Sequence, residues 1–74
     1  MDTISAQQAL QILRELSAAN SRADTVMVAC QSSGEHQAVH AIAREGIAKG
    51  TVAQVIRAPK HGTWSMSIRF RAGG

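Results

Sequence analysis

The sequence predicts a small α+β fold, with a single domain over residues 1–74 and elements in the order α-β-α-β-β. Two stretches with helical apolar spacing each follow a capping box, in which Ser or Thr and Glu or Gln satisfy the first amides of a helix. A run rich in β-branched residues separates them, and two alternating segments follow. These observations predict a three-stranded sheet that ends in a C-terminal antiparallel hairpin, with two helices on one face.

The first predicted helix begins after Ser5, and Gln8 completes its capping box. Asn20 supplies a C-terminal stop signal. The apolar positions cover about half of the helix circumference, and they are Ala6, Ala9, Leu10, Ile12, Leu13, Leu16 and Ala19. So wide an arc either covers the whole core or leaves part of the Leu10–Leu16 surface for a second subunit.

The segment Asp24–Gln31, DTVMVACQ, is typical of a buried strand. Alternation puts one set of side chains toward the core, namely Val26, Val28 and Cys30. We interpret Cys30 as a small core residue, because no neighbouring sequence feature would lower its thiol pKa. Met27 and Ala29 then lie on the outer face. Together with Leu10 and Leu13 they are candidate contacts for a partner protein or a second copy, although scattered surface apolar residues are normal.

The second predicted helix follows a capping box made by Ser32 and Glu35, and Gly50 marks its end. Gly46 either ends this helix early or allows close packing. His36, His40 and Arg44 recur at every fourth position, which indicates a polar stripe on a surface helix. Two histidines are too few for a structural zinc site, and the nearest further ligands would be Cys30 and His61. We therefore predict no metal.

The last two strands are predicted at Thr51–Ala58 and Thr63–Arg71. A three-residue loop, Lys60–Gly62, would align Val52 with Phe70, Gln54 with Ile68, Ile56 with Met66 and Ala58 with Trp64. A four-residue loop would suit Pro59 at the second position of a type I turn but would oppose Ile56 to Ser65. Burial of each large aliphatic side chain is worth about 1.5–3 kcal/mol, which favours the three-residue loop.

Charge is unevenly distributed along the chain. Residues 1–45 contain five acidic and three basic residues, whereas residues 46–74 contain five basic residues and no acid. In the chosen register, the outer face of the hairpin carries Arg57, Arg69 and Arg71 beside the hydroxyls of Ser65 and Ser67. Thr51, Ala53, Val55 and Thr63 also lie there, and Lys60 and His61 occupy the tip. Such a face suits phosphate or carboxylate groups, or it is a solvated face that discourages aggregation.

Other function classes have little support in the sequence. No nucleophile elbow or pair of catalytic acids is present, so we predict neither an enzyme nor a cofactor. The single cysteine precludes an intrachain disulfide, and the first residues lack the apolar run of a signal peptide. No segment approaches the length of a membrane span, and a cytoplasmic location is the expectation.

The segment Ala38–Trp64 contains AIAREGIAKGTVAQVIRAPKHGTW, a helix ending in Lys-Gly, a Thr-Val strand and a Gly-x-Trp hairpin. This pattern resembles small phage-encoded accessory proteins, among them some anti-CRISPR inhibitors of type I surveillance complexes. The resemblance implies a non-enzymatic inhibitor that occupies a nucleic-acid-binding surface of a nucleoprotein complex.

The sequence thus favours a binding module that uses Arg57, Lys60, His61, Arg69 and Arg71 to contact a nucleic acid or nucleoprotein. The alternative is a protein–protein module or homodimer that meets an acidic partner surface. Stacking of unpaired bases is not expected, because the predicted face contains no aromatic residue.

Overall fold

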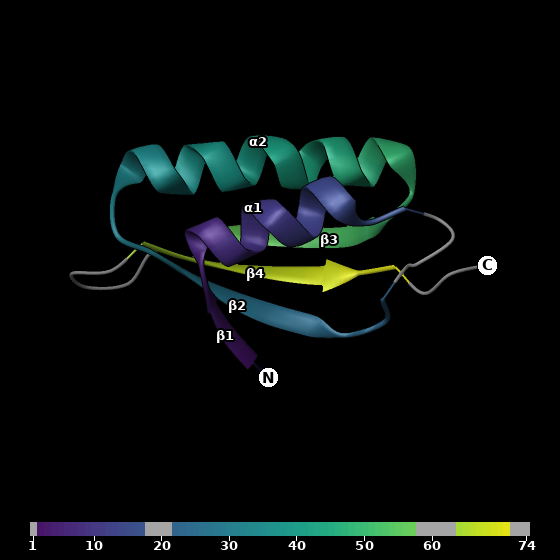
Figure 1. The fold of residues 1–74 in the computed structure, drawn as a ribbon, viewed down its shortest axis with the longest axis horizontal. Helices are drawn as coiled ribbons and strands as arrows, with labels where there is room; N and C mark the ends of the chain where they lie inside the picture. The colour runs from purple at the N-terminus through teal and green to yellow at the C-terminus, as the bar shows by residue number, and fades with distance from the viewer. Residues whose placement is uncertain (1, 18–21, 58–63, 72–74) are drawn as a thin grey trace.

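The computed structural model describes residues 2–17, 22–57 and 64–71, and it confirms a small α+β fold with two helices. The elements are β1 (Asp2–Ser5), α1 (Ala6–Glu15), β2 (Thr25–Cys30), α2 (Ser33–Lys49), β3 (Val52–Arg57) and β4 (Trp64–Phe70). Figure 1 shows both helices over the same face of the sheet, where they contact each other. We call the opposite face the open face.

The sheet has four strands and not three, because Asp2–Ser5 forms an unpredicted strand. This strand runs parallel to β2, and Ile4 aligns with Val28. Its sequence, DTIS, has a single large apolar residue, so no alternation was available to indicate a strand. Ser5 is both the last residue of β1 and the N-cap of α1, so the strand passes directly into the helix.

The strand order is β1-β2-β4-β3, and β4 is antiparallel to both of its neighbours. Strands β1, β2 and β3 therefore run in the same direction. They end at Ser5, Cys30 and Arg57, at one end of the sheet, which we call the carboxyl end. Both helices also begin there, and it lies on the left of Figure 1. Functional groups gather at this end in many open α/β sheets.

Helix α1 has the predicted capping box. The backbone N–H of Gln8 donates to Ser5 Oγ at 3.1 Å, and the backbone N–H of Ser5 donates to Gln8 Oε1 at 2.9 Å. The helix ends at Glu15 with Leu16 as its cap, whereas the predicted stop at Asn20 lies outside the described residues.

The predicted capping box of α2 forms only in part. Ser32 Oγ accepts from the backbone N–H of Glu35 at 3.1 Å. The Glu35 carboxylate, however, accepts from the backbone N–H of Gln31 at 2.7 Å and not from that of Ser32. The helix runs through Gly46 without a break and ends at Gly50, whose φ of 86° is left-handed. Gly46 therefore serves close packing: a Cβ there would lie 2.5 Å from Val52 Cγ2.

The core lies between the helices and the covered face of the sheet. Its buried hydrophobic residues within the described ranges are Ala6, Ala9, Leu13, Val26, Val28, Cys30, Val39, Ala43, Val52, Met66, Ile68 and Phe70. Met66, Ile68, Phe70 and Trp64 all lie on the predicted inner side of the last strand, but 38% of the Trp64 surface is exposed.

The hairpin register was predicted wrongly beyond its first pair. Val52 aligns with Phe70 as expected, but a β-bulge at Ala53 then shifts the pairing so that Val55 opposes Ile68 and Arg57 opposes Met66. Ile56 opposes Ser67 and not Met66, and it is 48% exposed. The loop whose length we debated lies outside the described residues.

The bulge has a physical explanation. Without it, Gln54 would lie opposite Ile68, which is completely buried, and its amide would need partners there. An unsatisfied buried polar group costs about 1–3 kcal/mol. The extra residue places Val55 inward in its stead, at the cost of exposing Ile56.

Candidate functional site

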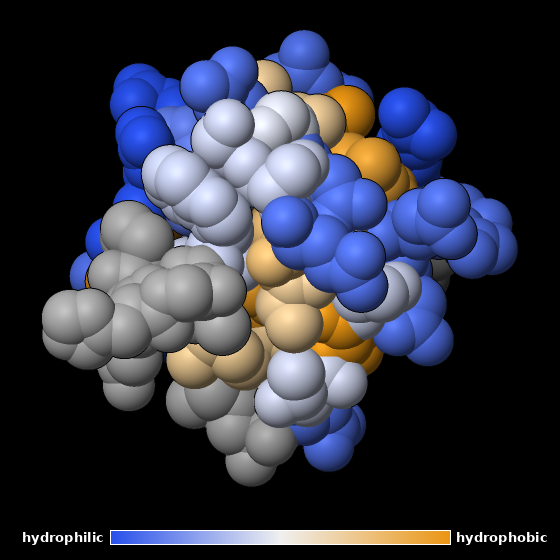
Figure 2. Space-filling view, turned by 90° about the vertical axis from the view of Figure 1, so that its left-hand side faces the viewer, coloured by the Kyte–Doolittle hydropathy of each residue, from blue (hydrophilic) through white to orange (hydrophobic). Residues whose placement is uncertain are grey.

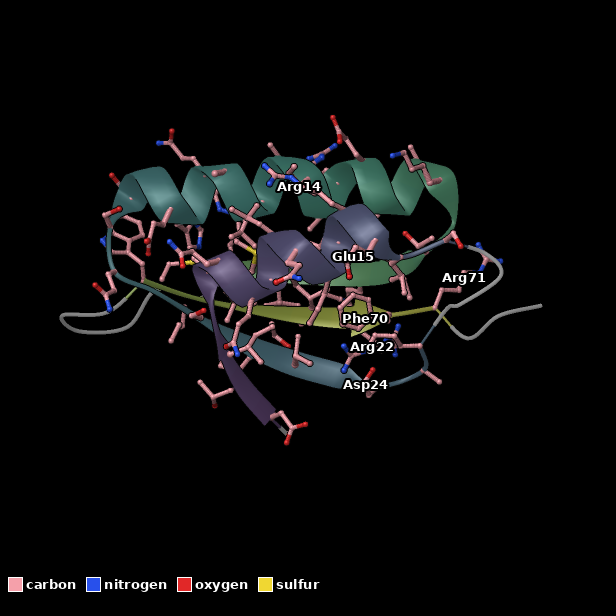
Figure 3. All side chains as sticks on the ribbon, in the orientation of Figure 1. Arg14, Glu15, Arg22, Asp24, Phe70 and Arg71 are labelled. Atoms are coloured by element: carbon pink, nitrogen blue, oxygen red, sulfur yellow. The ribbon has the colours of Figure 1, made fainter. Side chains whose placement is uncertain are left out.

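The residues of the predicted basic face do not share one surface. Arg69 lies on the open face, whereas Arg57 aligns with the inward-facing Met66 and so projects on the helix-covered side of the sheet edge. Arg71 follows the far end of β4, as Figure 3 shows. Lys60 and His61 lie outside the described residues. Thr51 and Val55, also assigned to the outer face, are buried and half-buried.

A different group of cations forms where α2 meets the edge strand β3. His40 is half-buried, and its pKa is lowered first by burial and then by the positive charges of Arg57, Arg44 and His36. Among the described residues, the charged groups that shift the pKa of His40 are thus all positive when ionised. We call Arg44, His40 and Arg57 the cationic strip.

The electrostatics of the strip have a consequence for stability. Because the folded state lowers the pKa of His40, protonation favours the unfolded chain, in which the pKa is about 6.5. The free energy of unfolding should therefore fall as pH drops through 6.5 and then through the folded pKa. Above about pH 7.5 the residue contributes nothing to the pH dependence.

The measurement is urea unfolding near pH 8 and near pH 5.5 for the wild type and for His40→Gln. We expect the wild type to lose more stability on acidification than the variant. An identical loss in both proteins would show that His40 is not held in an unfavourable positive field.

His36 lies one helical turn before His40 but is only 1% exposed, so the predicted polar stripe is wrong at this position. Its spacing with Val39, Ala43 and Gly46 puts it on the buried face of α2. The ring lies against Trp64, with 5.4 Å between centroids and an angle of 56° between planes. His36 Nε2 is buried and has no hydrogen-bond partner among the residues that the structure describes.

Arg22, which precedes β2, is engaged with neighbouring side chains. The Arg22 side chain donates two hydrogen bonds to the Asp24 carboxylate and lies 5.0 Å from the centre of the Phe70 ring (Figure 3). The hydrogen bond lowers the pKa of Asp24 and raises that of Arg22. This pair braces the sheet at the end opposite the carboxyl end.

The open face carries mostly small polar side chains around a few apolar ones. Its central residues come from β2 and β4 and pair with each other, Met27 with Ser67 and Ala29 with Ser65. Leu10 and Leu13, proposed to join Met27 and Ala29 in a partner contact, lie on the covered side and pack into the core. The structure therefore does not bring these four residues together.

A small pocket of about 250 Å³ lies at the carboxyl end, lined by Ser5, Ala6, Gln7, Ala29, Gln31 and Glu35. Figure 2 looks onto this end and shows apolar surface between more hydrophilic groups. The nearby Cys30 thiol is buried, and burial together with the Glu35 charge raises its pKa. A protonated thiol is a poor nucleophile, in agreement with the interpretation of Cys30 as a core residue.

The described residues contain no group of three or more His, Cys, Asp or Glu side chains placed to hold a metal ion. No helix within the described ranges has the length and apolar character needed to cross a membrane.

Comparisons with known proteins give no relative: no family model, no curated protein and no solved structure matches this chain.

Sequence reasoning found the components of the cationic strip but not their arrangement. His40 and Arg44 were assigned to a surface stripe, and Arg57 to the other side of the hairpin. The conflict over Gln54 was the signal that could have joined them. A bulge between Val52 and Val55 turns both valines inward and reverses the side on which Arg57 projects.

Proposed function

We propose that this protein is a non-enzymatic binding module that contacts the phosphates of a nucleic acid through the cationic strip. The observation that carries the proposal is geometric: Arg57 projects on the helix-covered side of the edge strand β3, and this strand packs against α2, which carries His40 and Arg44. A site that concentrates positive charge on two separate elements is preorganised for an anion, because the ligand relieves a repulsion already present.

The chemistry of these side chains suits phosphate. Arginine presents a planar fork of donors that matches two phosphate oxygens, and a histidine that becomes protonated adds a further charged donor. His40 and Arg44 are successive residues of one helix flank, one turn apart, and Arg57 lies across from them on the sheet edge. The strip can therefore contact more than one phosphate of a chain.

Glu35, the acid nearest the start of α2, lies on another side of the helix. It lines the pocket with residues of α1 and accepts a hydrogen bond from the Gln31 amide. Its charge therefore faces α1 and does not offset the strip.

The test is a binding titration with a labelled oligonucleotide over a range of salt concentrations. Removing two phosphate contacts with Arg44→Ala plus Arg57→Ala should reduce the slope of log K against log salt by about 1.4–1.8. We expect affinity at low salt to fall by about ten-fold. The matched control is Arg69→Ala plus Arg71→Ala, which removes the same charge from the open face and the far end of β4.

A larger loss in the control pair than in the strip pair would move the site back to the hairpin face predicted from the sequence. No salt-dependent binding in the wild type would remove the proposal. Equal affinity for polyglutamate and for an oligonucleotide of the same charge would reassign the strip to an acidic protein partner.

A further inference from the structure

We propose that Trp64 is a stacking platform for an unpaired base, so that the ligand of the cationic strip is single-stranded nucleic acid. This inference rests on the proposed function and names its substrate class. The structure brings an exposed indole, a buried histidine and Arg57, the member of the strip on β3, together at one corner of the carboxyl end.

Trp64 is the first residue of β4 and aligns with Cys30, on the side of the sheet that the helices cover. Residues further along the same side of β4, such as Met66 and Ile68, are completely buried, yet 38% of the Trp64 surface is exposed. The indole of Trp64 is thus partly buried against the core and partly exposed at the end of the sheet. Its exposed part is a hydrophobic surface beside polar groups. Such an arrangement suits the flat face of a nucleobase.

His36 supports the indole. The two rings are in tilted contact at 5.4 Å, and the histidine is fixed between α2 and the sheet with 1% of its surface exposed. An apolar side chain could fill this position with no polar atom to satisfy, whereas His36 Nε2 is left without a partner among the described residues. An unsatisfied buried polar group of this kind calls for an explanation, and in native proteins such exceptions concentrate where function is built.

The strip lies within reach of the indole. Arg57 aligns with Met66, so Trp64 is the diagonal neighbour of Arg57 on the same side of the sheet. Diagonal neighbours in an antiparallel pair are about 7–8 Å apart. On the helix, His36 precedes His40 by one turn, so His36 contacts Trp64 while His40 responds to Arg57. One nucleotide can thus place its base on Trp64 and its phosphate on the strip.

Duplex DNA cannot use this platform, because its bases are already stacked on one another and present only their edges. An unpaired base offers its π-face whatever its identity, so binding should be tolerant of sequence. The same geometry sets the ligand apart from a bare polyanion, which can occupy the strip but not the indole.

The experiment uses the intrinsic fluorescence of the full chain, which has one tryptophan and no tyrosine. Three probes are titrated: a single-stranded oligonucleotide, its duplex and inorganic polyphosphate. We expect saturable quenching with the single strand, weaker quenching and affinity with the duplex, and binding of polyphosphate with little quenching. Polyphosphate binding is followed by its displacement of a labelled oligonucleotide.

The affinities of the Trp64 variants, which lack the tryptophan signal, are measured with the labelled oligonucleotide. Trp64→Leu should lower the affinity for the single strand by about ten-fold or more while leaving that for polyphosphate unchanged. Trp64→Phe, which keeps a smaller aromatic face, should lose less. Circular dichroism shows whether each variant is folded, and a variant that is unfolded is replaced in the comparison by the other.

Equal affinities for single strand and duplex, or unchanged single-strand affinity in Trp64→Leu, would overturn the stacking role and leave the proposed function standing. Absence of binding to all three probes removes both proposals together.

Discussion

Replacing Gly46 by alanine is expected to destabilise the protein by about 1–3 kcal/mol or more, although alanine normally favours a helix. Alanine in a helix interior gains about 1 kcal/mol over glycine. Here the new Cβ would lie 2.5 Å from Val52 Cγ2 and 3.2 Å from Val52 Cβ. Val52 is a core residue at the start of β3 and cannot rotate away freely, so α2 and β3 must separate.

The cost is large on the scale of the whole protein. A domain of this length holds roughly 4–11 kcal/mol in total, and each kcal/mol shifts its melting temperature by about 4–8 °C. Thermal unfolding followed by circular dichroism measures the effect. Gly34→Ala is the matched control, because its nearest neighbour would be Ser32 Oγ at 3.8 Å, and its melting temperature should stay the same or rise. A Gly46→Ala protein as stable as the wild type would contradict the close packing of α2 on β3.

Met66→Ala is expected to cost about 2–5 kcal/mol, the range found when a large buried side chain is truncated in a core. Met66 is completely buried at the centre of the covered face, where it aligns with Val28 on one side and Arg57 on the other. Truncation removes apolar contacts and leaves a cavity that strands held on both sides cannot close.

Met27→Ala is the matched control, since Met27 belongs to the neighbouring strand but projects on the open face. Its truncation should cost only about 0.5 kcal/mol, as for most surface changes. Urea unfolding of both variants measures the difference. Similar losses in the two proteins would show that the open face is as tightly packed as the covered one, and the assignment of faces would then be wrong.

The parts of the fold that were predictable from the sequence are those governed by local chemistry. The capping residues Ser5 and Ser32, the alternation of β2 and the glycine at the end of α2 all depend on neighbours within a few positions. Strand β1 was not predictable in this way, because four residues with one large apolar side chain become a strand only when β2 is present to pair with them.

The candidate site depended on longer-range effects. Trp64 follows the same alternation as Met66, yet its position at the end of β4 exposes it, and no pattern within the strand records where the helices stop covering the sheet. His36 was placed at the surface because its spacing with His40 and Arg44 indicated a polar stripe. Only the packing of α2 on β4 shows that this position belongs to the interior.

The bulge at Ala53 decides on which face of the sheet the later side chains of β3 lie, and so where Arg57 can bind a ligand. A substitution can only exchange one side chain for another at a fixed place. If β3 paired regularly with β4 and Ala53 took a place in the ladder, every later side chain would change sides, moving Arg57 to the open face and Ile56 into the interior. Among related chains, deletion of Ala53 would therefore keep Arg57 on the covered side, because Gln54 already pairs with Arg69, whereas regular pairing that includes Ala53 would reverse the side on which the charge lies.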